Sequence, residues 1–306
     1  MFELNTKTRK VGHKIMDFIS TLINGLSLGS VYAMIALGYT MVYGIAKMLN
    51  FAHGDVIMVG SYIIFFTLNM TSNPWIAIAC SILFCIVLGI TIERVAYKPL
   101  RGASSLAVLI TAIGVSYMLQ SLAQLIFGVT PVQVPLFSEL KSIDIFGITI
   151  KSTSIITLVA CAVIMIALTL FINRSKTGRA MLAVSEDRGA AQLMGVDVNR
   201  TIAITFAIGS ALAAVASIFY IFMTPVTSPT FGAMPGIKAF VAAVFGGIGS
   251  IPGAMLGGIL IGIIEQMALK FDALSSYADA IVFGILVIVL LVKPTGLLGK
   301  KRNEKV

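Results

Sequence analysis

The sequence predicts an all-α membrane protein with about eight transmembrane helices. Of its 306 residues, 58% are hydrophobic and 11% are charged, and the mean hydropathy is +1.00. A soluble domain carries about 25% charged residues, whereas several apolar runs here approach the roughly 20 residues that a helix needs to cross a bilayer. No hydrophilic stretch is long enough for a separate catalytic or nucleotide-binding domain. We therefore expect one membrane domain over residues 1–306, with any source of chemical energy in another chain.

Eight apolar runs follow one another along the chain, and each is expected to be helical because backbone groups in lipid must satisfy their own hydrogen bonds. They are Phe18–Gly38, Val56–Met70, Trp75–Val95, Leu106–Phe127, Ile155–Ile172, Ile202–Met223, Ile237–Ile264 and Tyr277–Val292. The three cysteines lie inside these runs without metal-ligand or disulfide spacing. We interpret them as packing residues and predict no metal site.

Basic residues gather in four segments beside the apolar runs. Cytoplasmic loops of membrane proteins carry an excess of lysine and arginine, so the net charge of +9 indicates topology rather than binding to nucleic acid. We expect the cytoplasmic side to hold the N-terminus (1–17), Arg94–Arg101, the loop at 174–200 and the tail at 293–306. Both termini are therefore predicted to be cytoplasmic.

The number of crossings conflicts with that orientation. Three apolar runs lie between the N-terminus and Arg94, and three lie between Arg200 and Lys293, although both ends of each stretch are expected inside. An odd number of complete crossings cannot return to the same side. One segment in each half is therefore predicted to be re-entrant or divided in two, namely Tyr39–Asp55 in the first half and Ile237–Ile264 in the second.

Both segments have the composition of broken helices, with "NFAHGD" in the first and "FGGIGSIPG" in the second. Non-helical backbone at membrane depth is tolerated only beside protein or a watery cavity, and interrupted segments in corresponding positions of two halves indicate a transport path. The candidates for a translocation pathway or helix break are Asn50, His53, Gly54, Asp55, Gly246, Gly247 and Gly249.

Three roles stay open for the polar side chains Asn50, His53 and Asp55. The favoured hypothesis is that they cap the ends of broken helices, with His53 acting through hydrogen bonds. The alternatives are direct contact with a solute and a pH switch. One histidine two residues from one aspartate does not make a metal site.

Small residues also recur at four-residue spacing, as in Gly25 and Gly29, Gly253 and Gly257, and Gly258 and Gly262. This spacing allows two helices to approach closely. The sequence leaves open whether the partner helix belongs to the same chain or to a second subunit, and packing within the chain is favoured.

The basic loop "RSKTGRAMLAVSEDRGAAQLMGVDVNRT" from Arg174 mixes apolar and charged residues in the manner of one or two short amphipathic helices. Gly195 is placed to end such a helix. The segment is interpreted either as a connector lying on the lipid surface or as a docking helix for a partner protein. Its candidate contact residues are Arg179, Glu186, Asp187, Arg188, Ala190, Ala191 and Gly195.

Several catalytic and energy-coupling motifs are missing from the sequence. It contains no GxxxxGK[ST] phosphate loop, no HExxH, no Cys/His cluster and no GxSxG. Acidic residues deep within the apolar runs are scarce, because Glu93 and Glu265 lie near segment ends and Asp55 lies at a predicted break. An ion-driven carrier usually has an ionisable residue in mid-membrane, so this pattern argues against one.

Three longer motifs together resemble the permeases of branched-chain amino acid ABC transporters, in particular the shorter of the two paired subunits. They are "NGLSLGSVYAMIALGYTMVYGIAKMLNFAHGDVIMVGSY", "GRAMLAVSEDRGAAQLMGVD" and "AFVAAVFGGIGSIPGAMLGGILIGIIE". The similarity extends from about Asn24 to Gly299. One departure is Gly189, which stands where the coupling motif of ABC importers has glutamate, so the charges at Glu186, Asp187 and Arg188 become the candidates for that contact.

The resemblance implies a multi-pass protein of the bacterial inner membrane that imports leucine, isoleucine or valine. It implies a second homologous permease subunit, two cytoplasmic ATP-binding subunits, which the loop at 174–200 would contact, and a periplasmic substrate-binding protein. ATP would be bound by the partner subunits, so this chain needs no cofactor and is not expected to be an enzyme. Permeases for urea and short-chain amides share the same motifs, and a stand-alone carrier or a membrane-embedded enzyme remains as an alternative from another class.

Overall fold

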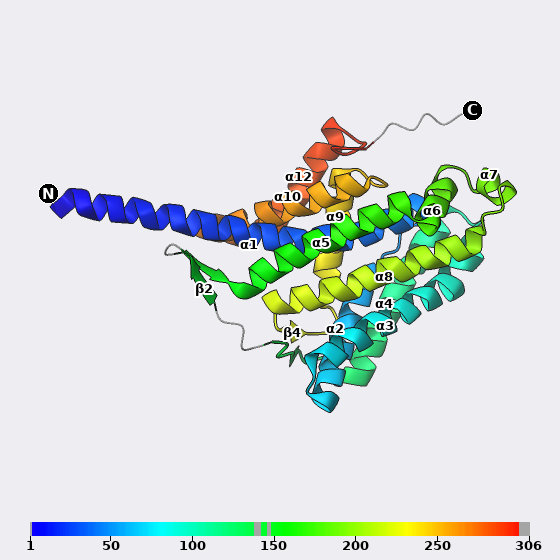
Figure 1. Ribbon diagram of the computed structural model, residues 1–306, viewed down its shortest axis with the longest axis horizontal. Coiled ribbons are helices and arrows are strands. Elements are labelled where there is room, and N and C mark those ends of the chain that lie inside the picture. The colour runs from blue at the N-terminus through cyan, green and yellow to red at the C-terminus, as the bar shows by residue number, and fades with distance from the viewer. Residues whose placement is uncertain (1, 138–141, 146–147, 300–306) are drawn as a thin grey trace.

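A computed structural model describes residues 2–137, 142–145 and 148–299. Helices form almost all of it, with short strands outside the helical bundle (Figure 1). In chain order, the elements are α1 (Phe2–Ala46), α2 (His53–Thr71), α3 (Pro74–Ile92), η1 (Glu93–Tyr97), η2 (Lys98–Leu100), α4 (Ser105–Phe127), β1 (Val132–Gln133), β2 (Ser142–Ile145), β3 (Ile148–Lys151), α5 (Ser152–Arg174), α6 (Lys176–Glu186), α7 (Arg188–Leu193), α8 (Val198–Met223), β4 (Val226–Thr227), α9 (Ala233–Gly246), α10 (Ile251–Lys270), α11 (Asp272–Ser275) and α12 (Ala278–Val292).

Seven of these helices are long and apolar enough to cross a membrane, counted within the described residues, and α9 and α12 are shorter apolar helices. The eight predicted apolar runs each fall on helical structure. Tyr277–Val292 forms the shorter helix α12. At Ile237–Ile264 the chain forms two helices, α9 and α10, with residues 247–250 between them, so the eight runs correspond to nine apolar helices among the described residues.

The long helix α1 is the centre of the fold. It packs against α10, α8, α9 and α5, and its first turns project beyond the other helices (Figure 1). Glycine allows the closest of these contacts, since a Cβ on Gly29 would lie 2.7 Å from the backbone of Ile259 and one on Gly258 would lie 2.3 Å from the backbone of Ala33. The repeated glycines at these positions therefore serve packing of α1 against α10 within the chain.

One predicted break is misplaced. Tyr39–Asp55 is neither a re-entrant segment nor a short separate crossing, because Tyr39–Ala46 continues α1 and the helix passes through Gly44 without interruption. The chain leaves helical structure only at residues 47–52 and enters α2 at His53. Gly44 lies beside Gly249, where a Cβ would be at an ordinary van der Waals distance of 3.7 Å.

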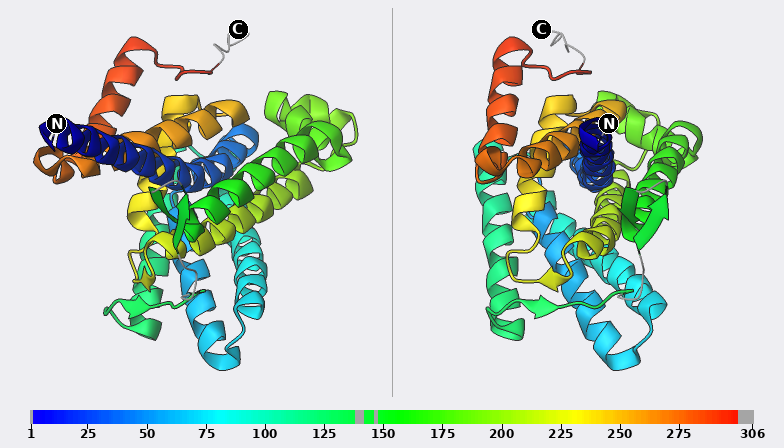
Figure 2. Two further views of the ribbon diagram at one scale, coloured as in Figure 1. Left: turned by 60° about the vertical axis from the view of Figure 1, so that its left-hand side comes forward. Right: turned by 90° about the vertical axis from the view of Figure 1, so that its left-hand side faces the viewer.

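The contacts define two ends of the bundle. At the end that carries α6 and α7, which we call the α7 end, the last residue of α1 meets α7 through Ala46 and Arg188. At the other end, strand β1 pairs antiparallel with β4, Val132 opposite Thr227, and we call it the β1–β4 end. Figure 2 shows α2 and α3 as a hairpin whose turn lies at the far side from α6 and α7.

Candidate functional site

The α1–α2 junction, residues 47–52, is held by side chains from another part of the chain. The Tyr97 hydroxyl donates to Asn50 Oδ1 at 3.0 Å and to the Leu49 carbonyl at 3.3 Å. The backbone N–H of His53 donates to the Asn50 carbonyl at 3.2 Å, so Asn50 contacts both the start of α2 and the neighbouring η1. Asn50 is 4% exposed, and these bonds fix the shape of the junction.

The His53 side chain lies between α1 and α2, fully buried. Its ring meets the Tyr39 ring edge-on with the centroids 4.7 Å apart, and its Nε2 has no hydrogen-bond partner in the described part of the chain. A Cβ on Gly38 would come within 2.4 Å of that nitrogen, so α1 needs glycine at this position to make room for the imidazole. The ring is therefore tightly packed between Tyr39 and a glycine of α1.

Gly54 lets the first turn of α2 touch the first turn of α9. A Cβ on Gly54 would lie 2.6 Å from the Gly232 carbonyl oxygen, and a Cβ on Gly236 would lie 2.8 Å from Gly54 Cα. Two helix N-termini therefore meet backbone to backbone inside the bundle. This contact joins the first segment that the sequence singled out to the start of α9, just ahead of the second segment, Ile237–Ile264.

The Asp55 carboxylate is bound by an uncharged partner. Gln120 on α4 donates from Nε2 to Asp55 Oδ1 at 2.9 Å and is also 3.3 Å from Ser116 Oγ. Asp55 is 2% exposed and lies in the first turn of α2, where the positive end of the helix dipole favours a carboxylate. The aspartate is thus stabilised by an amide and a helix end rather than by a cation.

The α9–α10 hairpin turns through glycine backbone. Gly247 and Gly249 have φ of +110° and +91°, a region that other residues enter only with strain. A Cβ on Gly246 would lie 1.9 Å from the Gly253 carbonyl oxygen, so the two helices start their contact at this glycine. The N–H groups of Leu297 and Leu298 donate to the carbonyls of Phe245 and Gly246, each at 2.9 Å, and these bonds tie the end of α9 to the C-terminal segment.

The predicted amphipathic loop forms α6 and α7. Ser175, Asp187 and Asp197 cap α6, α7 and α8 through side-chain oxygens; Asp187 Oδ1, for example, accepts from the Ala190 N–H at 3.0 Å. Gly195 follows α7 with φ of +83°, as expected for a helix-ending glycine. Of the predicted contact residues, Arg179, Glu186, Asp187, Ala190 and Gly195 are exposed, Ala191 is buried and Arg188 is half-buried.

The tip of α7 exposes two large apolar side chains. Leu193 and Met194 are 91% and 84% exposed, whereas Met181 and Val184 on α6 are buried against the bundle. These two residues adjoin the charged loop rather than a long apolar span. Exposed apolar groups bounded by charge are typical of a protein-binding surface.

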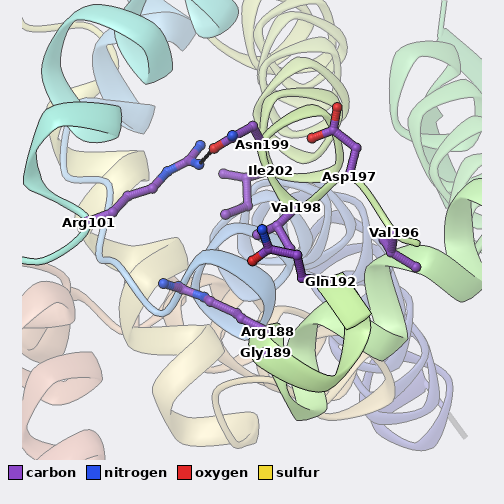
Figure 3. Close-up of a pocket in the computed structure, with 9 residues that line it drawn as sticks. All are labelled: Arg101, Arg188, Gly189, Gln192, Val196, Asp197, Val198, Asn199 and Ile202. Carbon is purple, nitrogen blue, oxygen red and sulfur yellow. Dashed lines mark hydrogen bonds between the residues drawn. The ribbon is translucent and has the colours of Figure 1, made fainter. Parts of the chain in front are cut away.

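Arg188 points inward, away from the surface on which the sequence placed it. Its guanidinium donates to the Ala46 carbonyl at the end of α1, where the negative end of the helix dipole favours a cation. Figure 3 shows Arg188 and Arg101 beside the same cavity, of about 420 Å³, with Arg101 reaching Asn199 of α8. Burial and the nearby Arg101 charge lower the pKa of Arg188. Arg188 therefore connects α7 to the α1–α2 junction.

A buried ionic cluster, which the sequence argument missed, joins four helices. Lys238 Nζ on α9 lies 2.8 Å from Glu265 Oε1 on α10 and 2.6 Å from Asp279 Oδ1 on α12. The Tyr32 hydroxyl on α1 donates to Glu265 Oε2 at 3.0 Å. Lys238 and Glu265 are 6% and 7% exposed, while the Asp279 side chain is 51% exposed.

This cluster corrects the argument that ionisable groups avoid the apolar runs. Glu265 looked peripheral because it lies near the end of a run, yet it faces Tyr32 at the middle of the span Met16–Ala46. One signal could have indicated the cluster: Lys238 is a lone cation inside the apolar run Ile237–Ile264, and a buried cation needs an acidic partner.

The geometry defines a class of protein: a multi-pass α-helical membrane protein with two interrupted segments in contact and a pair of short helices, α6 and α7, at one end. Comparison with known proteins then gives the family. Residues 21–291 match the family model "Branched-chain amino acid transport system / permease component", and the chain belongs to this family.

Curated relatives cover almost the whole chain. The high-affinity branched-chain amino acid transport system permease protein BraD of Pseudomonas aeruginosa is 45% identical over 96% of this chain and 99% of its own length. The permease protein LivH of the corresponding Escherichia coli system is 42% identical over 97% of this chain and all of its own. Among solved structures, an inward-facing metal-chelate type ABC transporter is 18% identical, with a TM-score of 0.49 over 89% of this chain and 87% of that one, a likeness too small to add to the assignment.

Proposed function

We propose that this chain is the permease subunit of an ABC importer that carries leucine, isoleucine or valine across a bacterial inner membrane. The observation that carries the proposal is its identity of 42–45% to BraD and LivH, permease proteins of branched-chain amino acid transport systems, over nearly the full length of each. Transport of urea or short-chain amides is the alternative, because permeases for these solutes share the same sequence motifs. The substrate named for these two relatives favours branched-chain amino acids.

The proposed energy source is a pair of separate ATP-binding subunits. The sequence has no phosphate loop, and family members are components of a transport system. The surface we assign to these subunits is the exposed face of α6 and α7, with Leu193 and Met194 as the apolar centre and Arg179, Glu186 and Asp187 around it. A second permease and a periplasmic binding protein complete the proposed assembly.

The proposed mechanism transmits motion of the ATPases to the α1–α2 junction. Arg188 bonds to Ala46 at the end of α1, and the Tyr97 hydroxyl holds the same junction through Leu49 and Asn50. Movement of α7 would therefore displace the start of α2, where His53, Gly54 and Asp55 meet α9. We assign the pathway to this contact between the N-termini of α2 and α9, with the glycine turn of the α9–α10 hairpin as its fixed side.

The proposed orientation differs at the N-terminus from the one predicted by charge. If the basic loop at 174–200 faces the cytoplasm, Ala46 lies on that side with Arg188. Asn24 of α1, by contrast, bonds to Ser154 at the start of α5, and Phe18 lies under Lys270 at the end of α10, both at the β1–β4 end. A single crossing by α1 then places the start of α1 outside. If all nine apolar helices cross the membrane, the C-terminal tail lies inside, and an odd number of crossings no longer conflicts with the orientation of the two ends.

The test of ATPase docking is a double substitution, Leu193→Asp with Met194→Asp, in the complete transporter. We expect the ATP-binding subunits to be lost from the purified complex, because two charges would replace the apolar centre of the contact. Leu274→Asp is the matched control, since Leu274 is 43% exposed on α11 at the β1–β4 end. Full retention of the ATP-binding subunits by the double variant would contradict the assignment of this surface.

One observation favours a second candidate, a stand-alone carrier. The cluster of Lys238, Glu265 and Asp279 is the kind of intramembrane ionisable group that ion-driven carriers use. Uptake of labelled leucine into vesicles separates the two functions: the importer requires ATP and the ATP-binding subunits, whereas the carrier works from this chain alone under an ion gradient.

A further inference from the structure

A groove between α3 and α8 opens at the α7 end and has no part in the proposed docking surface. It has a volume of about 510 Å³ and is lined by the ends of both helices and by η1 and η2. The two helices lie side by side (Figure 2). Its residues divide into a basic rim and an apolar wall.

The basic rim consists of Arg94, Lys98 and Arg200, which are exposed. Arg94 and Lys98 follow α3 directly, and Arg200 lies in the first turn of α8. The three cations therefore surround the mouth of the groove, at the level where the apolar spans end.

The apolar wall lies deeper, toward the middle of the helices. Ile90 precedes Arg94 by about one helical turn, and Ile204 and Ala207 follow Arg200 by about one and two turns, or roughly 5–10 Å along the axis. A molecule that fills the groove would meet cations at one end and hydrocarbon along the rest.

The positive charge of the rim exceeds the negative charge of the acids beside it. Glu93 is paired with Arg101. Asp197, which caps α8 by accepting from the Arg200 N–H at 3.0 Å, keeps its charge, so one carboxylate stands against the three cations of the rim. The ion pairs found among the described residues do not involve Arg94, Lys98 or Arg200.

We propose that this groove binds an anionic phospholipid, with the phosphate against Arg94, Lys98 and Arg200 and an acyl chain along the apolar wall. Basic pockets between transmembrane helices at the cytoplasmic face recognise anionic head groups, and lipid surrounds this surface in the membrane. The apolar wall favours a lipid over an acidic segment of a soluble partner, because such a segment would leave the wall unfilled. The proposal takes its membrane side from the proposed function, but its test does not depend on transport.

The experiment measures phospholipid binding to the purified complete transporter by native mass spectrometry, with phosphatidylglycerol and phosphatidylcholine titrated separately. Arg94→Gln with Arg200→Gln should weaken binding of phosphatidylglycerol about tenfold or more, because each basic residue near the surface contributes about 1 kcal/mol of attraction to an anionic lipid. The same double variant should leave binding of phosphatidylcholine unchanged. The matched control is Lys151→Gln with Lys270→Gln, which removes the same charge at the other end of the bundle and should change binding less than twofold.

A second variant tests the groove itself. Ala207→Trp fills the apolar wall and should weaken phosphatidylglycerol binding as strongly, whereas Ala79→Trp on the exposed face of α3 should not. Unchanged phosphatidylglycerol binding in both groove variants would overturn the proposal. Displacement of the lipid by millimolar inorganic phosphate alone would also overturn it, because that result would indicate a simple anion site. Loss of the ATP-binding subunits from the groove variants with lipid binding intact would overturn it as well, because that result would indicate a protein-binding surface. Failure of leucine transport with these lipid results unchanged would count against the proposed function only.

Discussion

The two interrupted regions of this molecule are built in different ways. The α1–α2 junction turns without any glycine, and side-chain bonds from Tyr97 and Arg188 hold it. The α9–α10 hairpin turns through Gly247 and Gly249 and is tied by backbone bonds to the C-terminal segment. In the proposed mechanism, movement of α7 makes and breaks the bond of Arg188 to Ala46, whereas the glycine turn, closed by backbone bonds, stays in place. The contrast assigns the moving part to the first region and the support to the second.

The buried charged groups of the two regions also differ in how strongly they are bound. Asp55 at the first is met by the neutral amide of Gln120, while Lys238 in the hairpin is shared by Glu265 and Asp279. Removing one member of a buried ion pair leaves an uncompensated charge, so the hairpin is locked more strongly than the junction.

The largest effect is expected from Lys238→Met. This change leaves two carboxylates together without their cation and should lower the free energy of unfolding by about 3–5 kcal/mol. Asp55→Asn keeps an oxygen for the Gln120 amide and should cost about 1 kcal/mol or less. Denaturant unfolding in detergent micelles compares the two, and the triple variant Lys238→Met, Glu265→Gln, Asp279→Asn should recover most of the loss. An equal cost for Lys238→Met and Asp55→Asn would remove the contrast.

A pair of backbone substitutions should act in opposite directions at the two turns. Gly247→Ala forces alanine to φ of +110° and places its Cβ 2.5 Å from the Gly299 nitrogen, which should cost about 1–3 kcal/mol. Lys47, at φ of +53°, already carries the strain of a left-handed non-glycine residue. Lys47→Gly relieves this strain and loses the exposed bond from Lys47 Nζ to the Gly44 carbonyl at 2.6 Å, so it should be neutral or stabilising by up to about 1 kcal/mol. Thermal unfolding of both variants checks the sign, and a loss at Lys47→Gly as large as at Gly247→Ala would mean that the Lys47 side chain, not the backbone, holds the junction.

The smallest effect is expected from Tyr97→Phe. The variant keeps the ring, which packs 5.2 Å from Phe206, and removes the bonds to Leu49 and Asn50, at a cost of about 1 kcal/mol. We expect faster hydrogen exchange at the amides of residues 47–53 with little change in α9. Tyr117→Phe on α4, whose side chain is 66% exposed, serves as the control. Equal acceleration at the α9–α10 turn would show that the two regions open together.

The residues that sequence reasoning placed well are those whose role is local. A span must satisfy its own backbone hydrogen bonds in lipid, so its apolar run is visible in the sequence, and Gly247 and Gly249 are visible because only glycine adopts their backbone readily. Gly195, the predicted helix end, likewise acts on the residues just before it. The same local reasoning extended the first break back to Tyr39, although helix α1 continues to Ala46 and the chain leaves helical structure only at residues 47–52.

The sequence by itself determined the membrane class, the apolar spans, the glycine turn and the family resemblance. Only the tertiary structure decided that Tyr32 meets Glu265, 233 positions away, that Arg188 turns inward to Ala46, and that Gly54 meets Gly232. The physical reason is the range of the interactions: hydrophobicity and backbone conformation act on neighbouring residues, whereas the partner of a buried charge or of a glycine surface is set by how separate helices pack.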